Sequence, residues 1–96
     1  MMQHLIDREM SITQDEFFRI LPKALKTRRY EILNNVVYVK LGHGSITITL
    51  SPQTSRGIGS LVLPVIHVNF AVKNCPEAIS REFFDEFDFA FQKGGG

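Results

Sequence analysis

The chain predicts an α+β fold in which helices cover one face of a four-stranded antiparallel sheet. Three observations support this: a helical pattern near each end, an alternating pattern between them, and turn residues that separate the alternating segments. The chain has 96 residues, 44% hydrophobic and 22% charged, a composition typical of one soluble globular domain. We therefore expect a single two-layer sandwich over residues 1–96.

The C-terminal segment has the clearest helical pattern. Ile79, Phe83, Phe87 and Phe91 recur every fourth residue, which places them along one face of a helix. Burying such a side chain contributes about 1.5–3 kcal/mol, so this apolar stripe must pack against the rest of the domain. The helix is expected to begin within residues 74–77, because a proline there suits a first helical position.

The first helix is expected to begin at Thr13, because Thr13 and Glu16 have the spacing of a capping box. One arc of its helical wheel is apolar and holds Phe17, Phe18, Ile20, Leu21, Ala24 and Leu25. Pro22 removes a helical hydrogen bond and clashes with the preceding turn. We therefore expect either a kink at Pro22 or a second short helical segment from there to about Lys26.

The middle of the chain alternates between apolar and polar residues, as half-buried strands do. The expected strands, following one another as a meander, are residues 30–33, 36–41, 46–50 and 61–72. The last is expected to be regular only from Val65, because Pro64 belongs at an edge or a bulge. Residues 51–60 are expected to form a loop.

The two ends of the chain are less defined. Residues 1–10 and 94–96 are expected to be mobile, although residues 4–10 also allow a strand before the first helix. With that strand the order becomes β-α-β(4)-α, which is similar to the half-repeat of TATA-binding proteins and related helix-grip folds. This similarity concerns element order alone and implies no DNA binding.

Charge, cysteine content and hydropathy narrow the classes of partner. Eleven Lys and Arg against ten Asp and Glu give a net charge of +1, which does not favour nucleic acid. No apolar run is long enough to span a bilayer, and the N-terminal residues lack the pattern of a secretory signal. A single cysteine suits a reducing compartment, so we expect a cytoplasmic protein without a membrane partner.

No motif points to a catalytic residue, a metal site or a cofactor. His4, His43 and His67 are not spaced as metal ligands, and Cys75 has no histidine next to it in sequence to act as a base. One alternative remains open, a small-molecule site or modest enzyme with a pocket between sheet and helices, where His67, Tyr38 and Arg56 converge. A solvated polar sheet face is the competing interpretation of these residues.

A second set of residues predicts a protein contact. Phe89 falls opposite the phenylalanine stripe on its helix, and Leu63 has the parity of the uncovered sheet face, so both are candidates for exposed apolar contacts. Lys23, Lys26, Arg28 and Arg29 form a basic patch, of which Lys23, Arg28 and Arg29 are the candidate contact residues; the helix dipole alone also favours such a patch. We therefore expect a non-catalytic binding module whose partner is another protein or a second copy in a weak homodimer.

Three segments carry a family resemblance: residues 16–25, residues 59–65 and the aromatic end at residues 84–96. Together they resemble a family of small uncharacterised bacterial proteins that end in an aromatic helix followed by Gln-Lys/Arg-Gly-Gly-Gly. The resemblance implies common descent from about residue 8 onward and no known activity. The final Gly-Gly also resembles that of ubiquitin-like sulfur carriers, but three glycines after a helix reach only about 10 Å and favour a helix end capped by Gly94.

Overall fold

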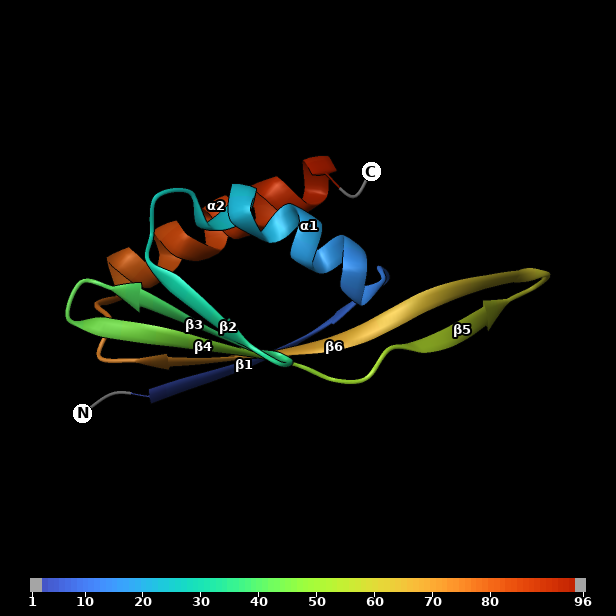
Figure 1. Ribbon diagram of the computed structural model, residues 1–96, viewed down its shortest axis with the longest axis horizontal. Helices are drawn as coiled ribbons and strands as arrows, with labels where there is room; N and C mark the ends of the chain where they lie inside the picture. The colour runs from blue at the N-terminus through green and yellow to red at the C-terminus, as the bar shows by residue number, and fades with distance from the viewer. Residues whose placement is uncertain (1–2, 95–96) are drawn as a thin grey trace.

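The computed structural model describes residues 3–94 and has two layers, with two helices on one face of an antiparallel sheet (Figure 1). The helices are α1 (Gln14–Leu25) and α2 (Glu77–Gly94). The strands are β1 (Gln3–Met10), β2 (Tyr30–Leu33), β3 (Val36–Leu41), β4 (Gly44–Leu50), β5 (Thr54–Ile58) and β6 (Leu61–Lys73). The prediction of a two-layer α+β domain is confirmed.

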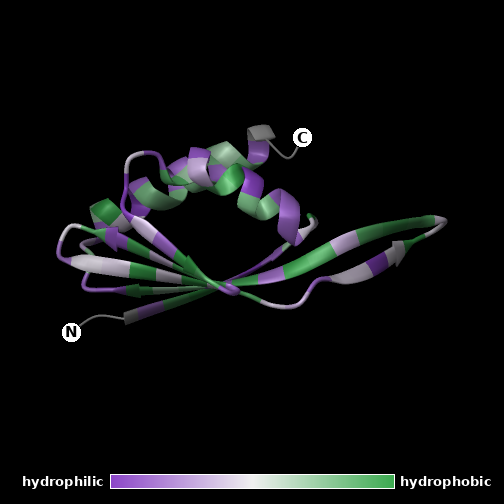
Figure 2. Cartoon of the chain, in the orientation of Figure 1, coloured by the Kyte–Doolittle hydropathy of each residue, from purple (hydrophilic) through white to green (hydrophobic). Residues whose placement is uncertain are grey.

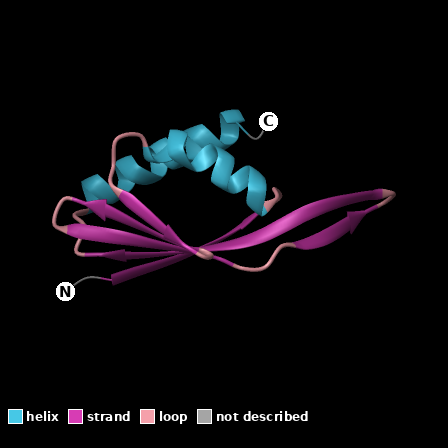
Figure 3. Ribbon diagram, in the orientation of Figure 1, coloured by secondary structure: helices cyan, strands magenta, loops and turns pink. Residues whose placement is uncertain are grey.

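The main sheet has the strand order β1-β6-β4-β3-β2, with antiparallel neighbours throughout (Figure 3). β2, β3, β4 and β6 are the four strands of the predicted meander. β1 pairs along the far side of β6, with Met10 opposite Ile66, so the additional N-terminal strand is present. The order of helices and strands along the chain nevertheless differs from that of the TATA-binding half-repeat, because a further strand, β5, precedes β6.

β5 corrects the expectation of a loop over residues 51–60. It pairs with the first part of β6, which begins at Leu61 rather than at Val65. Gly59 and Ser60 form the two-residue turn between them, and Gly59 has φ +61°, a conformation that glycine adopts at low cost. The alternation typical of a strand is missing here because all five residues of β5 are exposed.

Pro64 lies within the strand β6 without removing a bond from the β5–β6 ladder. In a hairpin with a two-residue turn the flanking pair, here Ile58 and Leu61, exchanges backbone hydrogen bonds. Counting from Leu61, the nitrogen of Pro64 points away from β5, to the side where β1 has already ended opposite Ile66. A proline in this position also hinders another strand from pairing there.

The core lies between the helices and one face of the sheet. The sheet contributes the buried residues that its alternation predicts, Val37, Val39, Leu41, Ile46, Ile48, Leu50, Ile66, Val68 and Phe70. From the predicted stripe of α2, Phe83, Phe87 and Phe91 are at most 9% exposed. Ile79 is 39% exposed, and Phe84, at 9%, is the fourth buried aromatic residue of the helix.

Phenylalanine rings join the two helices to the sheet. The ring centroid of Phe91 lies 4.5 Å from that of Phe87 within α2 and 5.0 Å from that of Phe17 in α1. Phe70 of β6 meets Phe84 at 5.0 Å and Phe87 at 5.2 Å, both edge to face. Such pairs contribute about 0.5–1.5 kcal/mol beyond their buried area, so this ring cluster is the principal contact between the layers.

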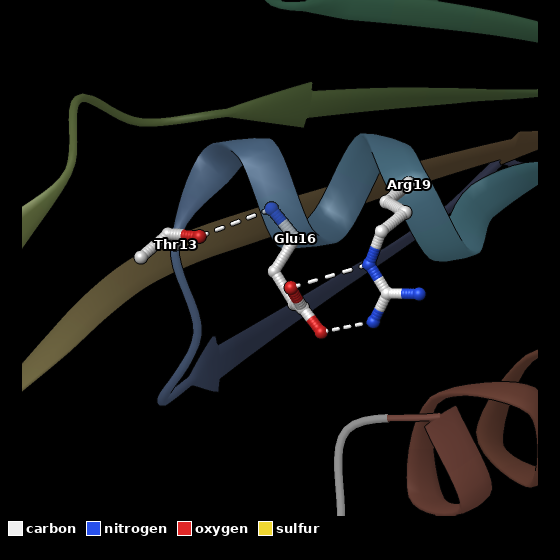
Figure 4. Close-up of polar contacts among 3 residues, drawn as sticks. All are labelled: Thr13, Glu16 and Arg19. Atoms are coloured by element: carbon white, nitrogen blue, oxygen red, sulfur yellow. Dashed lines mark hydrogen bonds and ion pairs between the residues drawn. The ribbon is translucent and has the colours of Figure 1, made fainter.

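The start of α1 is as predicted, and one of the two alternatives for its later course is wrong. The backbone N–H of Glu16 donates to the Thr13 hydroxyl at 3.0 Å, but the Glu16 carboxylate turns to Arg19 instead of returning to Thr13 (Figure 4). Half of the capping box therefore forms. α1 continues through Pro22 to Leu25, so the separate short segment was wrong; the buried apolar face on both sides of Pro22 holds the helix together.

Substituting Phe87 tests the ring cluster. We expect Phe87→Ala to lower the free energy of unfolding by about 3–5 kcal/mol, because a fully buried ring leaves a cavity. Phe89→Ala is the matched control on the same helix: its side chain is 65% exposed, and its loss should be about 0.5 kcal/mol or less. Urea unfolding followed by circular dichroism measures both, and equal losses would contradict this packing.

A second prediction concerns Gly44, the first residue of β4. A Cβ there would lie 2.4 Å from the carbonyl oxygens of Lys73 and Asn74. We expect Gly44→Ala to cost about 1–3 kcal/mol, because these backbone atoms have to shift. The control is Gly57→Ala in β5, whose Cβ would meet nothing closer than 3.9 Å. Thermal unfolding of both variants provides the comparison, and a Gly57 variant as unstable as the Gly44 variant would rule out the steric explanation.

Candidate functional site

A cavity of about 630 Å³ opens at the edge of the sheet formed by β2. This cavity, called the basic cavity below, is lined by Arg28, Arg29, Tyr30, Glu31, Tyr38, Val39, Lys40 and Ser45. It brings together two residues of the predicted basic patch, Arg28 and Arg29, with one residue of the predicted ligand site, Tyr38. From the sequence alone, Arg28 and Arg29 were candidates for protein contact and Tyr38 was a candidate for ligand binding.

The register of the sheet positions these side chains in two neighbouring rows. Lys40 stands opposite Ser45, and its backbone N–H donates to the carbonyl of Arg29 at 2.9 Å, which aligns Arg29 with the same row. In the next row Tyr38 stands opposite Glu31. Tyr38 and Lys40 are exposed on the uncovered face, because their neighbours along β3 point into the core.

The first of these rows carries uncompensated positive charge. It continues across the sheet, since Ser45 stands opposite Lys73 as well as Lys40. Within residues 3–94, the exposed Arg29, Lys40 and Lys73 side chains form no ion pair. We define them, with Ser45, as the basic row. Three cations without a neutralising partner favour an anion at this end of the sheet.

Arg28, in contrast, is engaged within the fold. One of its guanidinium nitrogens lies 2.7 Å from a carboxylate oxygen of Glu86 in α2, and its guanidinium carbon lies 5.5 Å from the centre of the Phe83 ring. The pKa of Glu86 is lowered, mainly by Arg28 and further by Lys26 at 3.5 Å, against an opposing effect of burial. Arg28 therefore fastens the segment after α1 to α2 and forms the wall of the cavity.

The three residues of the predicted ligand site do not meet at one point. Arg56 forms an ion pair with Glu9, which stands opposite His67, so Arg56 and His67 gather around Glu9 where β1 and β6 pair. Tyr38 stands opposite Thr47 of β4, which in turn stands opposite Ala71 of β6. Ala71 is four residues from His67 along this strand, a distance of about 13 Å. The sequence did not identify Glu9 because its place opposite His67 depends on the register of β1.

The residues predicted for protein contact are also dispersed. Phe89 is 65% exposed on α2, and Lys23 is exposed on α1 and does not line the basic cavity. Leu63 is half-buried in the hairpin formed by β5 and the first part of β6, opposite Arg56. We call this hairpin, residues 54–65, the arm.

The arm extends beyond the body of the domain (Figure 1), and the overall dimensions are 47 × 23 × 23 Å. Its part of β6 consists largely of hydrophobic residues (Figure 2). At its tip Ile58, Leu61 and Val62 are 53%, 62% and 71% exposed. The sequence did not identify this apolar tip because residues 51–60 were expected to form a loop, whereas pairing with β5 aligns these side chains at one end of the molecule.

Cys75 lies just before α2 and shares a second cavity, of about 280 Å³, with His4, Val72, Glu77 and Ser80. Its thiol donates to the backbone carbonyl of Lys73 at 3.3 Å, and burial raises its pKa. A raised pKa keeps the thiol protonated and a poor nucleophile. This geometry is that of a half-buried packing residue.

The remaining features add no further site. Among residues 3–94, no group of three or more His, Cys, Asp and Glu side chains is arranged to hold a metal ion. No helix in the same part of the chain has the length and apolar content needed to cross a bilayer. Gly94 ends α2 instead of following it as a cap, and the Gly95-Gly96 pair lies outside the described residues. The chain matches no protein-family model and no curated protein.

The ion pair at Glu86 predicts a pH-dependent stability. Because the folded-state pKa of Glu86 lies below its ordinary value of 4.5, its stabilising effect is present above about pH 4.5 and is lost as the pH falls through the lowered value. We expect Glu86→Gln to cost about 1 kcal/mol near neutral pH and almost nothing at about pH 2. Urea unfolding at both pH values tests this, with the exposed Glu82→Gln as control. An equal cost at both pH values would contradict it.

Proposed function

We propose that this domain is a non-catalytic, cytoplasmic protein-interaction module whose contact surface is the arm. The observation that supports this proposal is the apolar tip, where Ile58, Leu61 and Val62 are each more than half exposed. Single exposed apolar residues are ordinary, but three at the tip of one projecting hairpin, Ile58 and Leu61 on one face and Val62 on the other, are typical of a contact surface. The tip of the arm, residues 58–62, is exposed throughout and is therefore accessible to a partner.

The partner that these surfaces fit is a second copy of the chain. A two-stranded hairpin is of marginal stability alone in water, so the arm gains from being covered. Five residues of strand span about 17 Å, close to the 23 Å width of the molecule. The arm is thus long enough to lie across most of a partner's body.

The strand β2 offers a matching target on each copy. β2 is the last strand of the main sheet and exposes Ile32 and Leu33, at 48% and 62%. Its outer edge and that of β5 have no partner strand within residues 3–94. If each arm pairs with β2 of the other copy, both apolar sets are covered and the dimer closes on itself.

Sedimentation equilibrium of the full chain over a range of concentrations tests this proposal. We expect a reversible dimer for the wild type. We also expect a dissociation constant at least about tenfold higher for Leu61→Ser/Val62→Ser and for Ile32→Ser, since each loses more than about 1.4 kcal/mol of apolar contact. Leu5→Ser is the control, because Leu5 is 65% exposed but lies on β1, away from both contact surfaces.

A wild-type chain that stays monomeric at its highest soluble concentration would overturn the dimer. Capture of a different protein that depends on the same arm residues would replace the second copy by that partner. A dimer that survives both the arm and the β2 substitutions would show that another surface mediates it.

A further inference from the structure

We propose that the basic cavity binds a small phosphorylated molecule with a planar ring, of the nucleoside mono- or diphosphate class. The cavity has a volume of about 630 Å³, within the range of ordinary small-molecule sites. Its lining divides into a cationic part and an aromatic part, which correspond to the two chemically different ends of such a ligand. None of the lining residues belongs to the arm, although Tyr30 and Glu31 lie on β2, the strand proposed to receive the partner's arm, so the two proposals are tested with separate variants.

The cationic part consists of Arg29, Lys40 and Ser45, which share the basic row. The two cations are held side by side by the backbone hydrogen bond from Lys40 to Arg29, and Ser45 adds a hydroxyl donor opposite Lys40. A guanidinium, an ammonium and a hydroxyl are the donors that proteins direct at phosphate oxygens. Lys73, the next residue of the row, adds positive charge behind Ser45.

Most of the other described basic side chains, unlike those of this row, have an acidic partner. Six described basic side chains pair with an acid: Arg8, Arg19, Lys26, Arg28, Arg56 and Arg81. Of the four that do not, within the residues whose side chains are described, three are Arg29, Lys40 and Lys73. Charges left unpaired in one row are available to a ligand, since a phosphate need not displace an internal ion pair to bind them.

The aromatic part is formed by Tyr38, whose side chain is 46% exposed in the row next to the cations. An exposed tyrosine ring offers a stacking surface for a planar base. Glu31 stands opposite Tyr38, and its carboxylate accepts hydrogen bonds from an amino group or from ribose hydroxyls. The same carboxylate repels a phosphate from this row, so it fixes the direction in which the ligand lies.

The fold places an exposed aromatic ring beside the cations, which the order of residues in the sequence does not show. In the chain Tyr30 directly follows Arg29, but it stands opposite the buried Val39 and packs against the core, so it does not lie on the uncovered face beside Arg29. The pairing of β2 with β3 brings Tyr38 into that position, because Arg29 directly precedes β2 and the Tyr38 row adjoins the Lys40 row. The site therefore arises from the register of the sheet and not from a contiguous motif.

NMR titration of the ¹⁵N-labelled full chain tests the proposal, with ADP, inorganic phosphate and adenosine as separate ligands. We expect ADP to shift the amides of residues 29–31 and 38–40 and to bind at least about tenfold more tightly than phosphate or adenosine. Lys40→Gln and Tyr38→Leu should each raise the dissociation constant for ADP by about tenfold, equivalent to about 1.4 kcal/mol. Tyr38→Phe should bind nearly as the wild type does, because it keeps the ring.

Two controls separate this site from other features. Lys23→Gln removes an exposed, unpaired lysine outside the cavity and should leave ADP binding unchanged. Leu61→Ser/Val62→Ser, which disrupts the arm, should also bind ADP as before, so failure of the dimer and failure of this site are distinguishable.

Three results would overturn the proposal. ADP that binds no more tightly than inorganic phosphate would leave the tyrosine without a role. Shifts confined to residues outside the cavity, or no shifts at all, would remove the site. Binding of a short single-stranded oligonucleotide without binding of ADP would identify a nucleic-acid surface instead.

Discussion

The packing of phenylalanine rings between α2, α1 and β6 is the interaction on which the rest of this structure depends. Phe87 lies at its centre, 6.2 Å from Phe17 in α1 and 5.2 Å from Phe70 in β6, measured between ring centroids. Because side chains alternate along a strand, burying Phe70 places the adjacent Asn69 and Ala71 on the opposite face. Phe70 is aligned with Ile48 of β4 and Val37 of β3, which are buried on the same face. Tyr38 and Lys40 of β3 therefore lie on the opposite, exposed face. The ring packing thus determines which surface is available for binding.

Two of the carboxylates interleaved with the phenylalanines of α2, Glu86 and Asp88, also have a structural explanation. Arg8 of β1 lies over the ring of Phe84, 5.1 Å from its centre, and pairs with Asp88. Arg28 likewise lies over the ring of Phe83 and pairs with Glu86. Each arginine thus meets an aromatic face and an acid from one helix, which fastens β1 and the segment after α1 to α2. Arg8 and Arg28 are thus engaged within the fold, whereas Arg29, Lys40 and Lys73 form no ion pair in the part of the chain that the structure describes.

The sequence predicted the parts of the fold that have strong periodicity and missed those that depend on long-range pairing. The helices and the meander were predicted because their buried residues recur with a regular spacing. β5 was missed because its five exposed residues, including Arg56, show no alternation. Tyr38 and Arg29 were both identified as candidates, but their common cavity requires the register of β2 on β3. Likewise, only the β1–β6 register places Glu9 opposite His67.

Nuclear Overhauser effects between phenylalanine rings test the central packing most directly. In a chain with selectively labelled phenylalanines, this structure predicts contacts between Phe91 and Phe17, at 5.0 Å between ring centroids, and between Phe70 and both Phe84 and Phe87, at 5.0 and 5.2 Å. The absence of these contacts in a folded chain, or contacts of the α2 rings with β5 instead, would contradict the arrangement of helices and sheet described above.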